Sequence, residues 1–203
     1  MYRYLYDNIA FGRAIKDKVI SYVYDYANDS LPEPTERLEN NQSGNLYREY
    51  LELSMEPTLI TNHLYLGNAY NSANYEQLKE LNIGLIVNIT EEIPMYFPED
   101  FIYIHYPIRD VNGVDIKPHI EFIIDKIYDY IINPDNNDKN VLVHCYKGAS
   151  RSAAIVIAYQ LKYEKRTLDN IYEDIKEKRP VVNLNRSFWK SLSEFEIELQ
   201  LQK

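Results

Sequence analysis

The sequence predicts an α/β fold, with a central, mostly parallel or mixed sheet of about five strands that is flanked by helices. Short segments rich in β-branched residues alternate with longer segments of helical periodicity between residues 58 and 199. Strands that alternate with helices are typical of a sheet covered on both faces. The length of 203 residues is enough to bury one good core, so we expect a single domain with an extension.

Individual elements follow from local composition and spacing. Pro118 suits the first turn of a helix, because its missing N–H group costs nothing there. Thr167 is the expected N-cap of a later helix, and Pro180 is expected to end that helix. The expected strands are 58–61, 64–67, 85–89, 102–106 and 141–144. The expected helices are 72–81, 118–132, 151–163, 168–178 and 187–199.

The chain divides into an N-terminal extension, residues 1–45, and a main domain, residues 46–203. Apolar residues at helical spacing predict a helix over residues 8–27 of the extension. Residues 28–45 carry Pro, Asn, Ser and Gly in the pattern of a linker. Two roles stay open for the helix: packing on its own domain, or dimerisation or docking that would join two chains as a homodimer.

Composition narrows the classes of partner. The formal net charge is −9 and the pI is about 5.0, which argues against broad binding of nucleic acid or anionic membrane. No apolar run approaches the roughly 20 residues that span a bilayer, and the N-terminus lacks a signal-peptide pattern. The single cysteine excludes an intrachain disulfide and fits a reducing compartment. We therefore expect an intracellular, cytoplasmic protein.

The most informative segment is VLVHCYKGASRS, residues 141–152. A loop between a strand and a helix points its N–H groups inward, and the helix dipole adds positive potential. This geometry binds a tetrahedral oxyanion and stabilises a thiolate at Cys145. A structural core cysteine is the alternative, but it would not need Gly148, Arg151 and the hydroxyls of Ser150 and Ser152 at these offsets. The pattern suits phosphoryl transfer to sulfur.

The string His-Cys-x5-Arg-Ser resembles the signature loop of the cysteine-dependent protein tyrosine phosphatases, and Gly-Ala-Ser-Arg-Ser resembles their dual-specificity branch. Residues 64–69, 81–90 and 179–183 also resemble strings of that branch, in the same order. Leu184 and Ser187 depart from it, standing where the family often has proline and glycine. The resemblance implies a phosphatase fold and an enzyme that needs no cofactor. Such an enzyme would hydrolyse phosphotyrosine and phosphoserine or phosphothreonine through a phosphocysteine intermediate.

The expected catalytic residues are Cys145, Arg151, Asp110, Ser152 and His144. Cys145 would attack phosphorus as a thiolate, and Arg151 would grip two phosphoryl oxygens with its planar fork. The resemblance implies that His144 tunes the thiolate through hydrogen bonds and that the Ser152 hydroxyl assists breakdown of the intermediate. A buried histidine satisfied by backbone is compatible with the first of these roles.

The expected substrate-binding residues are those of the loop itself. Lys147 is expected to face outward, either attracting an anionic substrate or simply being solvated. The complete set is Tyr146, Lys147, Gly148, Ala149, Ser150 and Arg151.

A leaving oxygen needs a proton, so the chemistry requires a general acid. Asp110 follows a strand and begins a flexible loop, in the form of the family's mobile acid loop. Asp115 is the competing candidate, although its position just before a helix suits a stabilising charge at the helix start. The four histidines, His63, His105, His119 and His144, show no metal-ligand spacing, so no metal is expected.

Three functions compete. A phosphoprotein phosphatase leads, because the chain has little room for the extra loop that deepens the pocket of tyrosine-only enzymes. The same chemistry on RNA 5′-triphosphate or a phosphoinositide is the second, and the acidic net charge argues against it. The third is a non-catalytic phospho-binding module, of a kind that has usually lost the cysteine or the arginine that this chain keeps.

Overall fold

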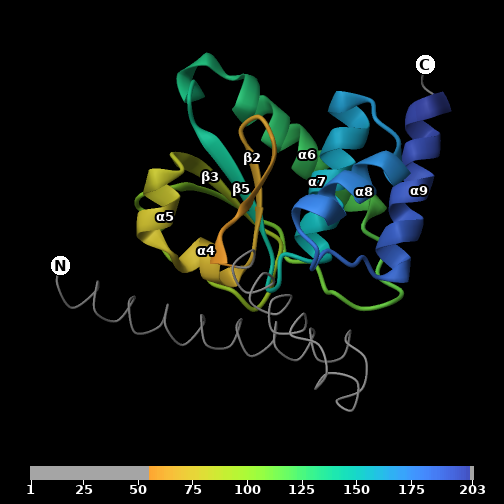
Figure 1. Cartoon of the computed structure of the whole chain (residues 1–203), viewed down its shortest axis with the longest axis horizontal. Coiled ribbons are helices and arrows are strands. Elements are labelled where there is room, and N and C mark those ends of the chain that lie inside the picture. Colours follow the sequence, from red (N-terminus) through yellow and green to blue (C-terminus); the bar gives the residue numbers. More distant parts are fainter. Residues whose placement is uncertain (1–54, 202–203) are drawn as a thin grey trace, which may run out of the picture.

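The computed structural model describes residues 55–201, and it shows a five-stranded mixed sheet with helices on both faces (Figure 1). The strand order is β1-β2-β5-β3-β4. The pair β1 and β2 is antiparallel, and the remaining three pairs are parallel. The predicted fold class is confirmed. The helix and linker predicted within residues 1–45 lie outside the described residues. The strands are β1 (Thr58–Thr61), β2 (Leu64–Gly67), β3 (Ile83–Asn88), β4 (Ile102–His105) and β5 (Asn140–His144).

The helices agree with the predicted ones, with three corrections. They are α4 (Ala69–Ala73), α5 (Tyr75–Glu80), α6 (Lys117–Ile132), α7 (Arg151–Tyr159), α8 (Leu168–Lys178) and α9 (Arg186–Leu201), with a 3₁₀ turn η1 (Pro134–Asn136) and a π-helical turn η2 (Gln160–Glu164).

The first correction concerns the helix predicted over residues 72–81, which is two helices. Asn74 divides them because its side chain accepts a hydrogen bond from the Gln77 amide and so begins α5 as an N-cap. The second is that α7 ends at Tyr159 and passes into η2. The third concerns the cap of α8: Thr167 stands at the N-cap position as predicted, but its side chain makes no capping hydrogen bond, and the Leu168 amide donates to Glu196 Oε1.

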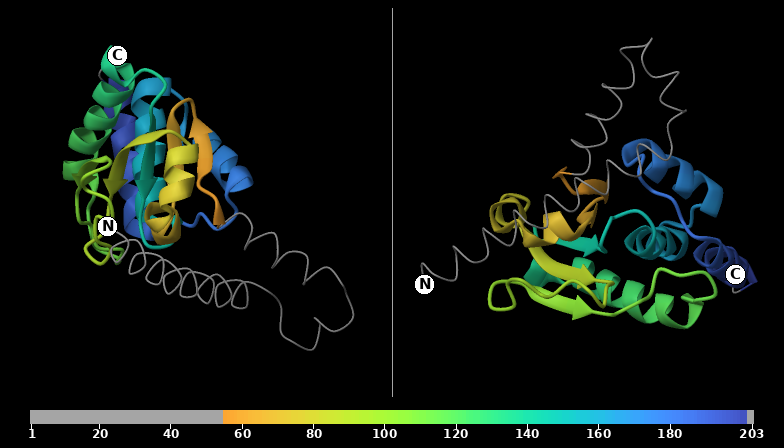
Figure 2. Two further views of the ribbon diagram at one scale, coloured as in Figure 1. Left: turned by 90° about the vertical axis from the view of Figure 1, so that its left-hand side faces the viewer. Right: turned by 90° about the horizontal axis from the view of Figure 1, so that it is seen from below.

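Side chains alternate between two cores along the central strands, because successive residues of a strand point to opposite faces. Val141 and Val143 of β5 pack with α6, α7, α8 and α9 on one face. Leu142 packs with the cluster beneath α4 and α5 on the other face. Figure 2 shows the sheet between these two helical layers. Every residue of α7 is buried, so this helix lies in the centre of the larger core.

Parallel pairing determines where the loops lie. Asn88 at the end of β3 is in register with both His105 of β4 and His144 of β5. The loops that follow β4 and β5 therefore begin at the same edge of the sheet. This is the edge where ligands bind in open α/β sheets, and it brings residues 106–116 next to residues 145–150.

Candidate active site

The loop from Cys145 to Ser150 is held by its carbonyl groups. The carbonyl of Tyr146 accepts from the Ala69 amide at 3.1 Å, and that of Ala149 accepts from the Asn183 amide at 2.9 Å. The carbonyl of Gly148 accepts from Arg179 Nε at 2.9 Å. In a planar trans peptide the following N–H points away from its C=O. Three carbonyls held outward therefore turn the next three N–H groups inward, which forms an anion cradle.

Gly148 is required at its position in this loop. Its φ of +68° lies in the left-handed region that favours glycine. A Cβ there would lie 2.5 Å from Arg179 Nη2 and 2.7 Å from the Gly67 carbonyl oxygen. The Gly148 amide also donates to Cys145 Sγ at 3.3 Å. Conformation, close packing and a hydrogen bond thus all depend on this residue.

Cys145 lies at the base of the cradle and is buried. The Ser152 hydroxyl donates to its Sγ at 3.1 Å, in addition to the Gly148 amide. Burial raises the pKa of the Cys145 thiol, but the positive charge of Arg151 and these hydrogen bonds outweigh burial, so the pKa lies below its usual value. The N-terminus of α7, which begins at Arg151, points at the same place. The site therefore favours a thiolate.

Arg151 is held on its outer edge by the Glu92 carboxylate, while its Nε edge makes no hydrogen bond within the described residues and faces Asp110 Oδ2 at 3.8 Å. Its Nη2 donates to Glu92 Oε1 at 2.6 Å and its Nη1 to Oε2 at 3.1 Å, while Nη1 also donates to the Ile108 carbonyl at 3.3 Å. Nε is buried and has no hydrogen-bond partner among residues 55–201. The Nε–H and the second Nη2–H form one edge of the planar guanidinium, and that edge suits two phosphoryl oxygens.

The two candidate acids lie in different surroundings. Asp110 Oδ1 accepts from the Ser150 hydroxyl and from Asn185 Nδ2, both at 2.9 Å, and its Oδ2 lies 3.8 Å from Arg151 Nε. Asp115 Oδ1 accepts from the Lys117 amide at 2.9 Å and the Ser191 hydroxyl at 2.8 Å.

The Lys117 amide is the main cause that holds the pKa of Asp115 below its usual value. Asp115 therefore supports the start of α6, whereas Asp110 is hydrogen-bonded to Ser150 of the loop from Cys145 to Ser150, the catalytic loop of this proposal. This geometry favours Asp110 as the acid.

The remaining predicted residues differ in how the structure places them. His144 is fully buried, and neither ring nitrogen has a hydrogen-bond partner within residues 55–201. The expected hydrogen bonding through this ring is therefore not seen. Burial lowers the pKa of His144 to about 3 and keeps it neutral, although the backbone of Cys145 opposes that shift. Tyr146 and Lys147 are half-buried, and the Ser150 hydroxyl is engaged by Asp110.

Sequence reasoning missed three residues of this site: Glu92, Arg179 and Asn185. Arg179 lies fully buried behind the loop, where it donates to Gly148 and, through Nη1, to Thr58 Oγ1 at 3.2 Å. Burial lowers the pKa of Arg179 to about 10, while the nearby Cys145 charge raises it. The family-like string at 179–183 was a signal for Arg179. No local pattern marks Glu92, because its contact with Arg151 joins residues 59 positions apart.

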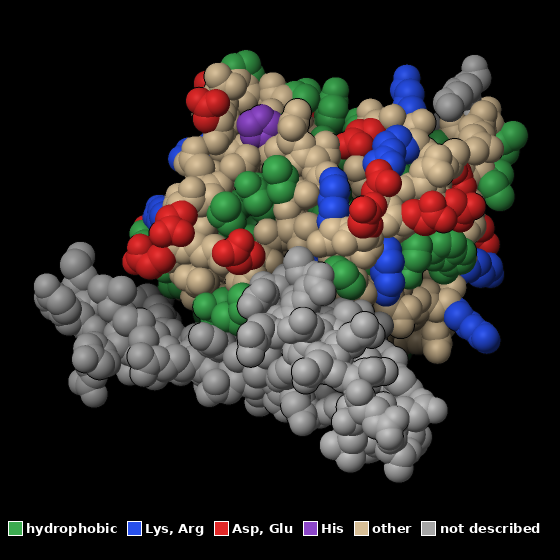
Figure 3. Space-filling view, in the orientation of Figure 1, with side chains coloured by type: hydrophobic (Ala, Val, Ile, Leu, Met, Phe, Trp, Pro, Cys, Tyr) green, Lys and Arg blue, Asp and Glu red, His purple; other side chains and the backbone are tan. Residues whose placement is uncertain are grey.

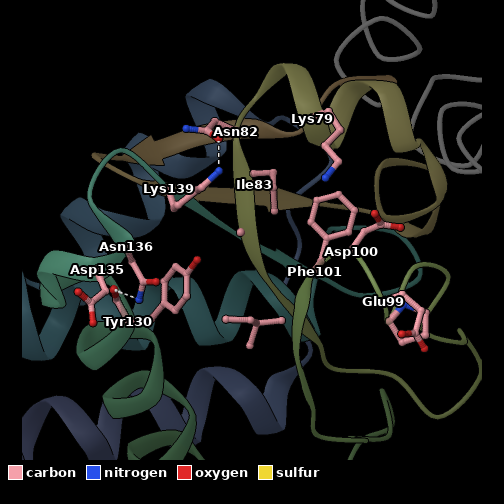
Figure 4. A pocket seen from close by; sticks show the side chains of 13 residues that line it. Lys79, Asn82, Ile83, Glu99, Asp100, Phe101, Tyr130, Asp135, Asn136 and Lys139 are labelled. Atoms are coloured by element: carbon pink, nitrogen blue, oxygen red, sulfur yellow. Dashed lines mark hydrogen bonds between the residues drawn. The ribbon is translucent and has the colours of Figure 1, made fainter.

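A cavity of about 480 Å³ lies at the opposite end of the strands, near the starts of β3, β4 and β5 (Figure 4). Lys139 Nζ donates there to Asn82 Oδ1 at 2.7 Å, and Lys79 Nζ lies 4.8 Å from the centroid of the Phe101 ring. Its lining includes neither Cys145 nor Arg151, so it is separate from the candidate site. Within residues 55–201, no cluster of side chains could hold a metal ion, and no helix has the length and apolarity of a membrane span.

Known proteins resemble this chain in both sequence and structure. The family model for the dual specificity phosphatase catalytic domain matches residues 64–198. Protein phosphatase Slingshot homolog 1 of Mus musculus is 34% identical over 203 residues, which cover 94% of this chain and 19% of that protein. The chain thus spans a small part of the length of this relative.

Dual specificity protein phosphatase 14 of Mus musculus is 34% identical over 140 residues, which cover 69% of this chain and 69% of that protein. The crystal structure of human DUSP28 superposes with a TM-score of 0.65 at 26% identity, covering 71% of this chain and 95% of that one. The match over residues 64–198 and the relative aligned over most of its length show that the chain belongs to the dual-specificity phosphatase family.

Proposed function

We propose that this chain is a cysteine-dependent protein phosphatase that hydrolyses phosphotyrosine and phosphoserine or phosphothreonine through a phosphocysteine intermediate. The observation that carries the proposal is the Nε edge of Arg151, which makes no hydrogen bond among the described residues, beside a thiolate-stabilising anion cradle. These two features together fit a tetrahedral phosphoryl group above Cys145. Membership of the dual-specificity family supports a phosphoprotein as the substrate.

In the first step, the Cys145 thiolate attacks phosphorus in line, so an S–P bond forms as the bond to the leaving oxygen breaks. The inward N–H groups and the Arg151 edge bind the phosphoryl oxygens, and their charge stabilises the loose transition state. Asp110 donates a proton to the leaving oxygen. Since Oδ1 already accepts two hydrogen bonds, Oδ2 is the oxygen that would carry this proton.

In the second step, water attacks phosphorus and Asp110 accepts its proton, while the S–P bond breaks and releases phosphate. The Ser152 hydroxyl donates to Sγ and so stabilises the departing thiolate. His144 stays neutral behind the cysteine and takes no part in proton transfer under this proposal. No metal ion or cofactor is required by these steps.

Cys145→Ser tests the nucleophile, because it should abolish turnover while phosphopeptide binding persists. Asp110→Asn tests the acid: kcat/KM should fall by roughly 100-fold or more for a poor phenol leaving group, in line with general-acid contributions, and far less for a good one. Asp115→Asn is the matched control. Residual activity in Cys145→Ser, or a larger leaving-group effect in Asp115→Asn, would contradict these assignments.

Substrate assays also test the two alternative functions, which are another substrate class and a phospho-binding module without turnover. Assays with a phosphopeptide, triphosphorylated RNA and a phosphoinositide side by side separate the substrate classes. On the face shown in Figure 3, Lys and Arg side chains are interspersed with Asp and Glu, a mixture that favours neither RNA nor an anionic lipid surface. Binding of phosphopeptide without any turnover would instead indicate a phospho-binding module.

The division at residue 45 and the dimerisation role of residues 1–45 are part of the same proposal. The helical spacing over residues 8–27 is their basis. Deletion of residues 1–45 followed by measurement of mass in solution tests the role. A change from dimer to monomer supports homodimerisation through this segment, and an unchanged number of chains per particle contradicts it.

A further inference from the structure

The acid loop, residues 106–116, is connected to the rest of the protein at few points. At the start of the loop, the Tyr106 amide donates to the carbonyl of Asn88, the last residue of β3, at 2.9 Å. Between Ile108 and Val114, which packs against the larger core, the backbone has little support, and Val111 is 53% exposed. Something else must determine where Asp110 lies.

The start of α9 provides that support. The Gly113 amide donates to the Ser187 hydroxyl at 2.7 Å. Among the described residues, this is the one hydrogen bond that joins the backbone of residues 109–115 to another element. Gly113 has a φ of +95°, a conformation that glycine adopts without strain and that turns its amide toward α9.

Two more side chains of the same helix start contact the loop on either side of this bond. Asn185 donates to Asp110 Oδ1, and its own Oδ1 accepts from the Phe188 amide at 2.9 Å, which ties Asn185 to the helix. Ser191 donates to Asp115 at the far end of the loop. Ser187 lies between them and is the contact to the loop backbone. A glycine, which the family often has at this position, would offer no hydroxyl.

We propose that Ser187 is a positioning residue for the acid loop: its hydroxyl holds the Gly113 amide and thereby keeps Asp110 beside Arg151 and the catalytic loop. The inference rests on the proposed function, since it assigns Ser187 a role through Asp110. Ser187 itself contacts no reacting atom. Its removal should therefore affect proton delivery to the leaving group more than substrate binding.

The test uses the full chain and compares Ser187→Ala, which removes the hydroxyl, with Ser187→Thr, which keeps one. Ser193→Ala is the matched control, because the Ser193 hydroxyl bonds only to the Trp189 carbonyl within α9. For an aryl phosphate with a poor phenol leaving group, kcat/KM should fall about tenfold in Ser187→Ala, because small misplacements of a catalytic group are costly. It should change little for a good leaving group, recover in Ser187→Thr and stay normal in Ser193→Ala.

Combining Ser187→Ala with Asp110→Asn makes the test specific. If Ser187 acts through Asp110, the double variant should be no slower than Asp110→Asn alone. An equal loss with both leaving groups, a further loss in the Asp110→Asn background, or no loss at all would overturn the proposal. Because the comparison depends on leaving group and background, a general loss of stability does not imitate the expected result.

Hydrogen exchange of the Gly113 amide gives a readout independent of turnover. Exchange should be faster in Ser187→Ala than in the wild type, and slow again in Ser187→Thr; unchanged exchange would overturn the contact. A wild type that hydrolyses no phosphate ester would overturn the proposed function and the positioning role together. An active wild type with a Ser187→Ala variant of normal leaving-group dependence would overturn the positioning role alone.

Discussion

The loops after β5 and β4 leave the same edge of the sheet, yet they are held in different ways. Residues 145–150 are held by three backbone carbonyls that accept from the start of α4 and from the segment between α8 and α9, around a glycine with no room for a side chain. Residues 106–116 are held mainly by side chains from the start of α9. The first arrangement suits a rigid anion cradle. The second can be released one bond at a time, which suits a loop that opens to admit substrate.

The largest expected loss of activity comes from the glycine of the anion cradle. Gly148→Ala places a Cβ against Arg179 and the Gly67 carbonyl, so the cradle must distort. We expect kcat/KM to fall roughly 100- to 1,000-fold, the range observed when one oxyanion donor is lost. Gly113→Ala is the comparison from the other loop: no atom lies within 4 Å of a Cβ there, so its cost is limited to the strain of an alanine at a φ of +95°. Steady-state kinetics should show a much smaller loss; equal losses would contradict the comparison.

Glu92→Gln tests the orientation of Arg151 by the carboxylate that follows β3. Burial disfavours the charge of Glu92, but the hydrogen bond from Arg151 outweighs it and lowers the pKa of the carboxyl. Without that charge Arg151 loses its bidentate partner, and kcat/KM should fall roughly 10- to 100-fold. Glu91→Gln is matched, because Glu91 pairs with Arg109, which is 73% exposed. A wild-type inhibition constant for inorganic phosphate in Glu92→Gln would argue against this role.

Two variants of Asn185 distinguish its contact with Asp110 from its contact with the start of α9. Asn185→Asp keeps an acceptor for the Phe188 amide but cannot donate to Asp110, whereas Asn185→Ala loses both contacts. Both variants should lose about three- to tenfold in kcat/KM for a poor leaving group, as expected for a slightly misplaced acid. Only the alanine variant should also lose about 1 kcal/mol of unfolding free energy, the usual value of an N-cap. Denaturant titration measures this difference, and normal kinetics in Asn185→Asp would contradict the contact with Asp110.

The smallest effect at neutral pH, where only stability and not rate is concerned, is expected for the histidines that end β4 and β5. The pKa of His144 is lowered from 6.5 to about 3 by burial, so below pH 6.5 the unfolded chain binds a proton that the folded chain does not. His144 therefore contributes stability above pH 6.5 that is lost as the pH falls toward 3, by at most about 1.4 kcal/mol per pH unit. His144→Gln should show a shallower loss of unfolding free energy over that window than the wild type. His105→Gln, at the matching position of β4, is the control; an identical pH dependence in His144→Gln would refute the assignment.

The sequence predicts the loop after β5 more completely than the loop after β4. Residues 141–152 contain the strand end, the cysteine, the glycine, the arginine and the helix start, so their spacing alone predicts a cradle. The place of Asp110 after a strand favours it over Asp115, and its contact with Ser150 supports the proposal that Asp110 is the acid. Glu92 and Ser187 were not predicted to touch the site, because each is joined to its partner only through the fold.

The sequence by itself determined the fold class, the order of the elements and the chemistry of the loop after β5. Each of these depends on residues close together in the chain, through periodicity, β-branched runs and glycine conformation. Tertiary structure alone decided which edge of Arg151 binds Glu92, how Arg179 contacts the cradle and how α9 contacts residues 106–116. Those features arise where parallel strands bring distant segments together at the carboxyl ends of the strands. Contacts between such distant segments leave no pattern in the local sequence.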